Sequence, residues 1–192
     1  MQAPTSARSN LSLEEFLKLP ETEPASEYAD GRIYQKPTPQ GKHSRLQTRL
    51  SAAINETIEP TRIGCAFTEL RCTFGKRSII PDIAVFEWNR IPINAQGEVE
   101  NIFPIHPDWT IEILSPDQRP IRVINNILFC LNQGTQLGWL IAPEEKTVII
   151  FQPNQQPIAK EVDSELLPVL ELLGDWRLTL GDLFAWLSFA KS

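Results

Sequence analysis

The sequence contains no apolar run that approaches the roughly 18 to 20 residues needed to span a bilayer. Its N-terminal residues also lack the apolar core of a secretory signal peptide. Only three cysteines are present, Cys65, Cys72 and Cys130, an odd number without the spacing of metal ligands. We therefore expect reduced cysteines in a protein core, no membrane contact and a cytoplasmic location.

Positive charge is also scarce, because 18 lysines and arginines face 24 acidic residues and leave a net charge of −6. This balance is unusual for a protein that binds nucleic acid, which normally presents a basic face. The distribution is uneven, since residues 32–77 hold nine basic and three acidic residues, a local charge of +6. Such a basic half can steer a molecule toward phosphate, although the split also fits an ordinary solvated surface.

The length and composition indicate one domain. A chain of 192 residues that is 42% hydrophobic and 22% charged has the make-up of an ordinary globular protein with room for a full core. We expect a single domain over residues 1–192, in which residues 1–10 form a flexible lead-in and residues 12–187 form the folded core.

Apolar periodicity and turn signals predict an alternation of helices and strands. A capping box from Ser12 to Glu15 predicts a first helix that Pro20 ends, and Asp30-Gly31 predicts a tight hairpin. The order predicts an α/β or α+β domain with a mixed central β-sheet flanked by helices. Further helices are expected over residues 43–58, 121–132 and from about 180, and strands over 65–74, 79–86, 109–114, 138–142 and 147–151.

Two of these strands have features that bear on a site. Residues 65–74 alternate in polarity, so Glu69 is expected on the solvent face of one half-exposed strand. Pro81 lies inside the next strand and cannot donate to a ladder, which favours an edge position or a bulge that aims a side chain.

A single carboxylate stands in each of two apolar strands, Asp82 in the first and Glu112 in the second. A buried carboxylate is unfavourable unless a cation, hydrogen-bond donors or a proton compensate it. If the two strands are neighbours, these side chains can share one cation, and paired carboxylates suit Mg²⁺ or Mn²⁺. A metal site of this kind activates water for attack on phosphate.

An ordered set of motifs gives the chain a resemblance to a known family. The set comprises Glu27-x-x-Asp30-Gly31, His43 at a helix start, Pro81-Asp82 in a strand, the run from Glu112 to Pro116 at a strand end, and Gly134 before a strand that contains Trp139. Over about residues 12–187, the chain resembles the cyanobacteria-rich restriction endonuclease family of the PD-(D/E)xK nuclease superfamily. The resemblance implies a restriction-endonuclease-like core and a metal-dependent endonuclease that acts on nucleic acid, with DNA as the expected substrate.

The resemblance also implies roles for individual residues. Asp82 and Glu112 would hold Mg²⁺ or Mn²⁺ together with the Ile113 carbonyl, and Glu27 would assist from the edge of the site. His43 and Arg45, near the start of the second helix, would contact nucleic acid; packing of the helix start is the alternative for His43. A homodimer, in which two sites cut two strands, is compatible with the family.

The lysine of the superfamily motif is missing from its usual place two residues after the glutamate, where this sequence has Leu114. In the family that the chain resembles, the lysine lies on the following helix, one turn before an aromatic residue. With Phe129 as that aromatic, the position falls on Asn125, whose neutral amide cannot stabilise charge on phosphate. Arg122 is the nearest cation on the helix and can stabilise charge, although it is a poor proton shuttle.

Three functions are compatible with these residues. The leading one is a metal-dependent endonuclease in which the carboxylates and Arg122 act and Asn125 weakens the activity. A second is a catalytically lapsed domain of the same fold that binds metal, nucleic acid or a protein partner. A third is a structural domain in which the carboxylates pair with Arg71 or Arg122. Metal binding that Asp82→Ala abolishes would separate the first two from the third.

Overall fold

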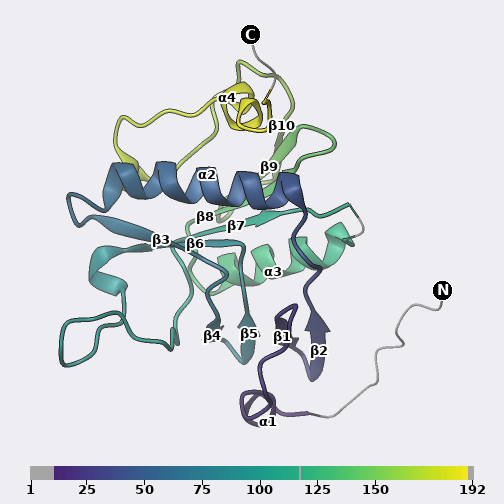
Figure 1. Ribbon diagram of the computed structural model, residues 1–192, viewed down its shortest axis with the longest axis vertical. Helices are drawn as coiled ribbons and strands as arrows, with labels where there is room; N and C mark the ends of the chain where they lie inside the picture. Colours follow the sequence, from purple (N-terminus) through teal and green to yellow (C-terminus); the bar gives the residue numbers. More distant parts are fainter. Residues whose placement is uncertain (1–10, 117, 190–192) are drawn as a thin grey trace.

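The computed structural model describes residues 11–116 and 118–189 (Figure 1). The flexible lead-in expected over residues 1–10 lies outside the described residues. The helices are α1 Leu13–Phe16, α2 Gly41–Ile58, α3 Pro120–Asn132 and α4 Leu180–Ala185, with 3-10 turns η1 Trp88–Arg90 and η2 Glu171–Leu173. The strands are β1 Ser26–Ala29, β2 Arg32–Gln35, β3 Gly64–Thr68, β4 Cys72–Phe74, β5 Arg77–Ile79, β6 Ile83–Glu87, β7 Trp109–Ile113, β8 Leu137–Ala142, β9 Thr147–Phe151 and β10 Ile158–Lys160.

Within the described chain, a central sheet has six strands in the order β10-β9-β8-β7-β6-β3. β7 and β8 run parallel and are connected through α3, whereas the other neighbours are antiparallel. Helices α2 and α4 cover one face of this sheet, and α3 covers the other (Figure 1). The predicted α/β class with a mixed central sheet is therefore confirmed.

Successive side chains of a strand point to opposite faces of the central sheet, so alternate residues pack against α2 and against α3. Ile83 of β6 and Ile111 of β7 pack in the cluster beneath α2, whereas Ala84 of β6 packs in a cluster with Cys130 of α3. Glu112 alternates with Ile111 and Ile113 and therefore points to the α3 side, whereas Asp82 lies in the bend before β6 and contacts His43 of α2. The opposing stripe of α2 is fully buried and repeats at helical spacing, as the sequence predicted: Leu46, Leu50, Ile54 and Ile58.

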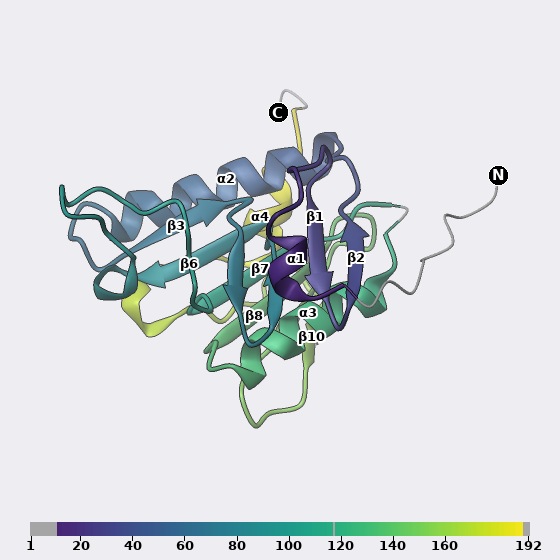
Figure 2. The same cartoon turned by 90° about the horizontal axis from the view of Figure 1, so that it is seen from below.

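A second sheet, of four described strands in the order β2-β1-β5-β4, lies on the α3 side of the central sheet (Figures 1 and 2). The predicted hairpin is present, because β1 pairs with β2 around Asp30 and Gly31, whose φ angles are 52° and 79°. Left-handed conformations at both central residues define the hairpin turn that favours Asp-Gly. This hairpin brings Glu27 toward the central sheet.

The structure corrects two strand predictions. Residues 65–74 are not one strand: β3 ends at Thr68 in the central sheet, Glu69 takes a left-handed φ of 50°, and β4 begins at Cys72 in the second sheet. Residues 79–86 are likewise divided, since β5 ends at Ile79 and β6 starts at Ile83. Pro81, which cannot donate to a ladder, marks the crossing between the two sheets. Alternation in sequence cannot reveal that a chain changes sheets.

The predicted cap of the first helix is present. Ser12 and Glu15 form the expected capping box, although α1 ends at Phe16, before Pro20. Trp176 and Trp186 pack against the main core. Among the helices that the structure describes, none is both long and apolar enough to cross a membrane.

Candidate active site

Asp82 and Glu112 come together where β6 and β7 pair. The antiparallel register sets Ile83 against Ile111, and its continuation by one residue sets Asp82 opposite Glu112. Directly opposed residues bring their Cβ atoms to within about 4.5–5.5 Å. Both side chains are buried, with exposures of 2% and 4%. The two carboxylates that the sequence placed in separate strands therefore occupy one site.

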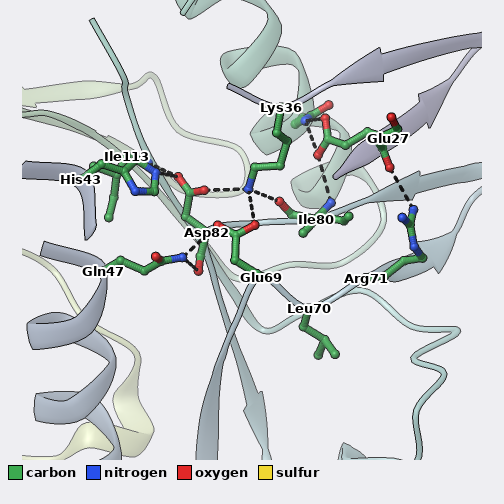
Figure 3. Close-up of polar contacts among 12 residues, drawn as sticks. Glu27, Lys36, His43, Gln47, Glu69, Leu70, Arg71, Ile80, Asp82 and Ile113 are labelled. Atoms are coloured by element: carbon green, nitrogen blue, oxygen red, sulfur yellow. Dashed lines mark hydrogen bonds and ion pairs between the residues drawn. The ribbon is translucent and has the colours of Figure 1, made fainter. Parts of the chain in front are cut away.

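Asp82 is held by donors from three parts of the chain (Figure 3). Its Oδ1 accepts a hydrogen bond from Lys36 Nζ at 2.7 Å, and its Oδ2 accepts one from the Ile113 N–H at 2.7 Å and lies 3.0 Å from His43 Nε2. Burial raises the pKa of this carboxyl, but Lys36 and His43 outweigh the burial and lower the pKa to about 2. Asp82 is therefore ionised at neutral pH and fixed in orientation.

Glu112 has the opposite environment. Its carboxylate accepts no hydrogen bond from another residue in the described part of the chain. Burial, and then the neighbouring charge of Asp82, raise the pKa of Glu112 well above its ordinary value, and Lys36 offsets only part of this shift. A buried carboxyl beside an ionised one is stabilised when a cation binds between them.

Glu27 reaches the same region from β1. It is 4% exposed, and its Oε1 accepts a hydrogen bond from the Ile80 N–H at 2.9 Å. Its Oε2 accepts from Arg122 Nη2 at 2.8 Å and from Asn126 Nδ2 at 3.0 Å. The guanidinium of Arg122 also lies over the ring of Tyr34, 3.3 Å from the ring centre. The expected proximity of Glu27 and Arg122 to the site is therefore found.

The helix face that reaches the carboxylates carries Asn126, one residue after the expected Asn125. Asn126 is buried at 6% exposure and its side chain donates to Glu27, whereas the side chain of Asn125 is exposed and forms no hydrogen bond with another described residue. Each helical residue is turned by about 100° from the one before it, and Asn126 lies four residues after Arg122 on the same face. The sequence prediction counted one turn back from Phe129, and that count could not decide whether Asn125 or Asn126 faces the site.

Three site residues were missed by the sequence reasoning. Lys36 follows β2 and was noted only as part of a basic stretch, yet its side chain is 11% exposed and contacts Asp82. Glu69 is exposed, as expected, with 38% of its side chain accessible, but it also contacts Lys36 Nζ at 3.0 Å. Gln47 of α2 donates to Glu69 Oε1 at 3.0 Å and to the Asp82 carbonyl at 2.8 Å (Figure 3). The sequence offered one signal for Lys36: it directly follows the second predicted strand of the hairpin, in a chain with two buried carboxylates that need a cation.

The two residues expected to contact nucleic acid lie in different surroundings. His43 is buried at 5% exposure beside Asp82, and its Nδ1 has no partner among the described residues. Arg45 is turned toward the C-terminal segment, where its Nε donates to the Trp186 carbonyl at 3.0 Å and its guanidinium lies over Phe189. Contact of either residue with nucleic acid remains a prediction.

The basic stretch over residues 32–77 carries less free charge than its sequence suggests. Four of its nine basic side chains form ion pairs within the described chain: Lys36 with Asp82 and Glu69, Lys42 with Glu144, Arg71 with Glu21, and Arg77 with Asp30. Arg71 therefore pairs with an exposed acid and not with either site carboxylate. The attraction of this region for phosphate is correspondingly weaker.

The donor chemistry of the site fits a hard divalent cation. Mg²⁺ commonly takes one or two carboxylates and keeps several waters. Glu112 offers an oxygen without a donor, and Asp82 lies opposite it with its charge fixed. No group of three or more His, Cys, Asp or Glu side chains suited to a metal is found in residues 11–116 and 118–189. An ion would therefore depend on this pair, and it would share Asp82 with Lys36.

The mixed sheet flanked by helices, with carboxylates at adjacent strands, matches a restriction-endonuclease-like nuclease fold. The chain belongs to the Uma2 family, described as "Putative restriction endonuclease", whose model matches residues 13–181. This finding confirms the family that the motifs predicted.

A solved structure is similar over nearly the whole chain. It is the crystal structure of "a putative nuclease belonging to DUF820" from Anabaena variabilis ATCC 29413, with 54% sequence identity and a TM-score of 0.91. The match covers 93% of this chain and 99% of that chain. None of the curated proteins compared with this chain matches it.

Proposed function

We propose that this protein is a cytoplasmic, metal-dependent endonuclease that hydrolyses phosphodiester bonds of nucleic acid, with DNA as the expected substrate. The observation that carries the proposal is the convergence of Glu27, Asp82 and Glu112 on one buried site beside the β6–β7 junction. Family membership and the similarity to the Anabaena protein support a nuclease.

The proposed reaction is a hydrolysis. A water oxygen attacks phosphorus, the bond from phosphorus to the leaving oxygen breaks, the attacking water loses a proton to solvent, and the leaving oxygen gains one. Mg²⁺ or Mn²⁺ held by Asp82, Glu112 and the Ile113 carbonyl would supply Lewis acidity that polarises the phosphate and lowers the pKa of water. The Ile113 N–H and Lys36 fix the Asp82 carboxylate before substrate binds.

Two expectations belong to the same proposal. Nucleic acid would approach the start of α2 near His43 and Arg45, because the free N–H groups at the start of a long helix favour phosphate. Two copies of the chain would form a two-fold dimer that presents two sites to two strands. Light scattering at several protein concentrations measures the second expectation directly.

A catalytically lapsed nuclease domain is the second candidate. The observation that favours it is the amide that α3 presents to the site, since Asn125 stands where the family resemblance calls for a lysine and its neighbour Asn126 is the residue bonded to Glu27. Such a domain would still bind a divalent cation through Asp82 and Glu112 but would cut nothing.

The deciding experiment combines calorimetry with cleavage. Wild type, Asp82→Asn and the exposed control Asp163→Asn are titrated with Mn²⁺ and then incubated with plasmid and single-stranded DNA at low salt. The proposal expects wild type and Asp163→Asn to bind Mn²⁺ and cut DNA, and Asp82→Asn to do neither. Binding without cleavage by wild type would favour the lapsed domain, and absence of binding would leave the carboxylates with a structural role alone.

A further inference from the structure

Lys36 is the most constrained cation of the site. Its ammonium group donates to Asp82 Oδ1 at 2.7 Å, to the Ile80 carbonyl at 2.7 Å and to Glu69 Oε2 at 3.0 Å (Figure 3). These contacts use all three of its donors. The side chain is 11% exposed, so the ammonium is withdrawn from solvent and fixed in direction.

The negative charge of the neighbouring carboxylates needs a compensating cation, and Lys36 provides it for Asp82. The Lys36 ammonium lies 2.7 Å from Asp82 Oδ1 and 3.0 Å from Glu69 Oε2, so it stands between two carboxylates. The other nearby cation, Arg122, is committed to Glu27 and to the ring of Tyr34. Lys36 is thus the positive charge in direct contact with Asp82.

Neither of the two places where a lysine was expected holds one. Leu114 occupies the position two residues after Glu112, and α3 presents the amide of Asn126 to the site. Lys36 instead arrives from the segment after β2, on the side of Asp82 opposite the Ile113 N–H. A charged group in this place can stabilise negative charge that develops on a phosphate.

We propose that Lys36, directly after β2, is the cationic group of this active site and takes the place of a lysine on β7 or α3. The inference rests on the proposed nuclease function. It has a consequence beyond activity: Lys36 and a divalent cation both interact with Asp82, and like charges at a few ångströms repel. Removal of the lysine charge should therefore tighten metal binding while it slows cleavage.

A purely structural lysine would behave differently. If Lys36 only neutralised Asp82 in the fold, its loss would weaken the fold, and cleavage per folded molecule would not change. Tighter metal binding together with slower cleavage is a result that a structural role does not produce. Lys36→Arg adds a second criterion, because it keeps the charge and should restore wild-type metal affinity.

The test compares wild type, Lys36→Met and Lys36→Arg with the control Lys160→Met, which removes a lysine paired with Glu165 at 3.2 Å on β10. Calorimetry measures the Kd for Mn²⁺, plasmid cleavage gives kcat and KM, and thermal melting reports folding. We expect Lys36→Met to bind Mn²⁺ at least about tenfold more tightly and to lose about 10²- to 10³-fold in kcat with little change in KM. Lys160→Met should match wild type in both measurements.

The outcomes separate the inference from the function on which it rests. If wild type cuts and folded Lys36→Met cuts equally well, or binds Mn²⁺ more weakly, the role of Lys36 is overturned and the nuclease stands. If wild type cuts nothing, the proposed function falls and the inference falls with it. If Lys36→Met does not fold, Lys36→Gln, which can still donate to the Ile80 carbonyl, is measured under the same expectations.

Discussion

The Glu27 carboxylate accepts a hydrogen bond from the Ile80 N–H at 2.9 Å, and this bond joins the β1–β2 hairpin to the segment that leads into Asp82. The same carboxylate accepts from Arg122 and Asn126 of α3. Glu27 therefore connects the second sheet, the crossing at Pro81 and the helix behind the site. Ile80 stands two residues before Asp82, so this contact joins a residue of the hairpin to the segment that carries Asp82.

Glu27→Ala should destabilise the protein. The change leaves the Ile80 N–H and the Asn126 amide without their acceptor and removes the partner of Arg122. We expect a loss of about 2 kcal/mol in the free energy of unfolding, measured with urea. The control is Glu21→Ala, because Glu21 also pairs with an arginine but its side chain is 75% exposed. Exposed pairs contribute about 0–1 kcal/mol, so equal losses in the two variants would contradict the connecting role of Glu27.

The stability of the protein should depend on pH through Asp82 and Glu112, whose pKa values are shifted in opposite directions. The folded-state pKa of Asp82, about 2, is below its ordinary 3.8, so its contribution is present above about pH 4 and is lost as the pH falls toward 2. The folded-state pKa of Glu112 is raised above 4.5, so its protonated form is favoured by folding. The contribution of Glu112 to the free energy of unfolding is therefore most favourable at low pH, and it is lost as the pH rises through the folded-state pKa.

Glu112→Gln should therefore stabilise the metal-free protein at pH 8, by about 1.4 kcal/mol for each unit by which the pKa of Glu112 is raised. Urea unfolding in EDTA at pH 5 and pH 8 measures this change. Glu171→Gln, at an exposed acid in η2, serves as the control and should leave the pH dependence unaltered. A variant less stable than wild type at pH 8 would show that Glu112 has a compensating partner.

The register of α3 is tested by two neighbouring substitutions of the same kind. Asn126→Asp places a carboxylate against Glu27 in a buried position and should lower the free energy of unfolding by about 2 kcal/mol or more. Asn125→Asp changes an exposed residue and should stay within about 0.5 kcal/mol of wild type. Thermal melts of the two variants decide the point, and a larger loss for Asn125→Asp would reverse the assignment.

Gly138 marks a tight contact between β8 and α3. A Cβ at this position would lie 2.4 Å from Ile127 Cγ2, so Gly138→Ala should cost about 1–3 kcal/mol through overpacking. Gly41, in the first turn of α2, has nothing within 4 Å of its Cβ position. Gly41→Ala should be neutral or stabilise by up to about 1 kcal/mol, since it lowers the entropy of the unfolded chain. Denaturant midpoints compare the two variants, and an equal effect at both positions would refute the close packing.

Much of the fold could be predicted from local signals. Apolar spacing predicted α2 and α3, and the Asp30-Gly31 dipeptide predicted the β1–β2 hairpin, in whose turn both residues have positive φ. These features are decided by neighbours along the chain, within one turn or one strand. The predicted limits of β3, β5 and β6 were wrong, because the point at which the chain leaves one sheet and enters the other depends on pairing partners that are distant in sequence.

The sequence by itself determined the family, the α/β class and the presence of two carboxylates in apolar strands that need compensation. Only the tertiary structure decided which groups compensate them. Lys36 and Glu69 lie 33 residues apart, and Lys36 and Asp82 lie 46 apart, yet they form one ion cluster in which Lys36 and Asp82 are buried. Such contacts leave no local periodicity in the chain, because long-range packing and the low dielectric of the interior select them.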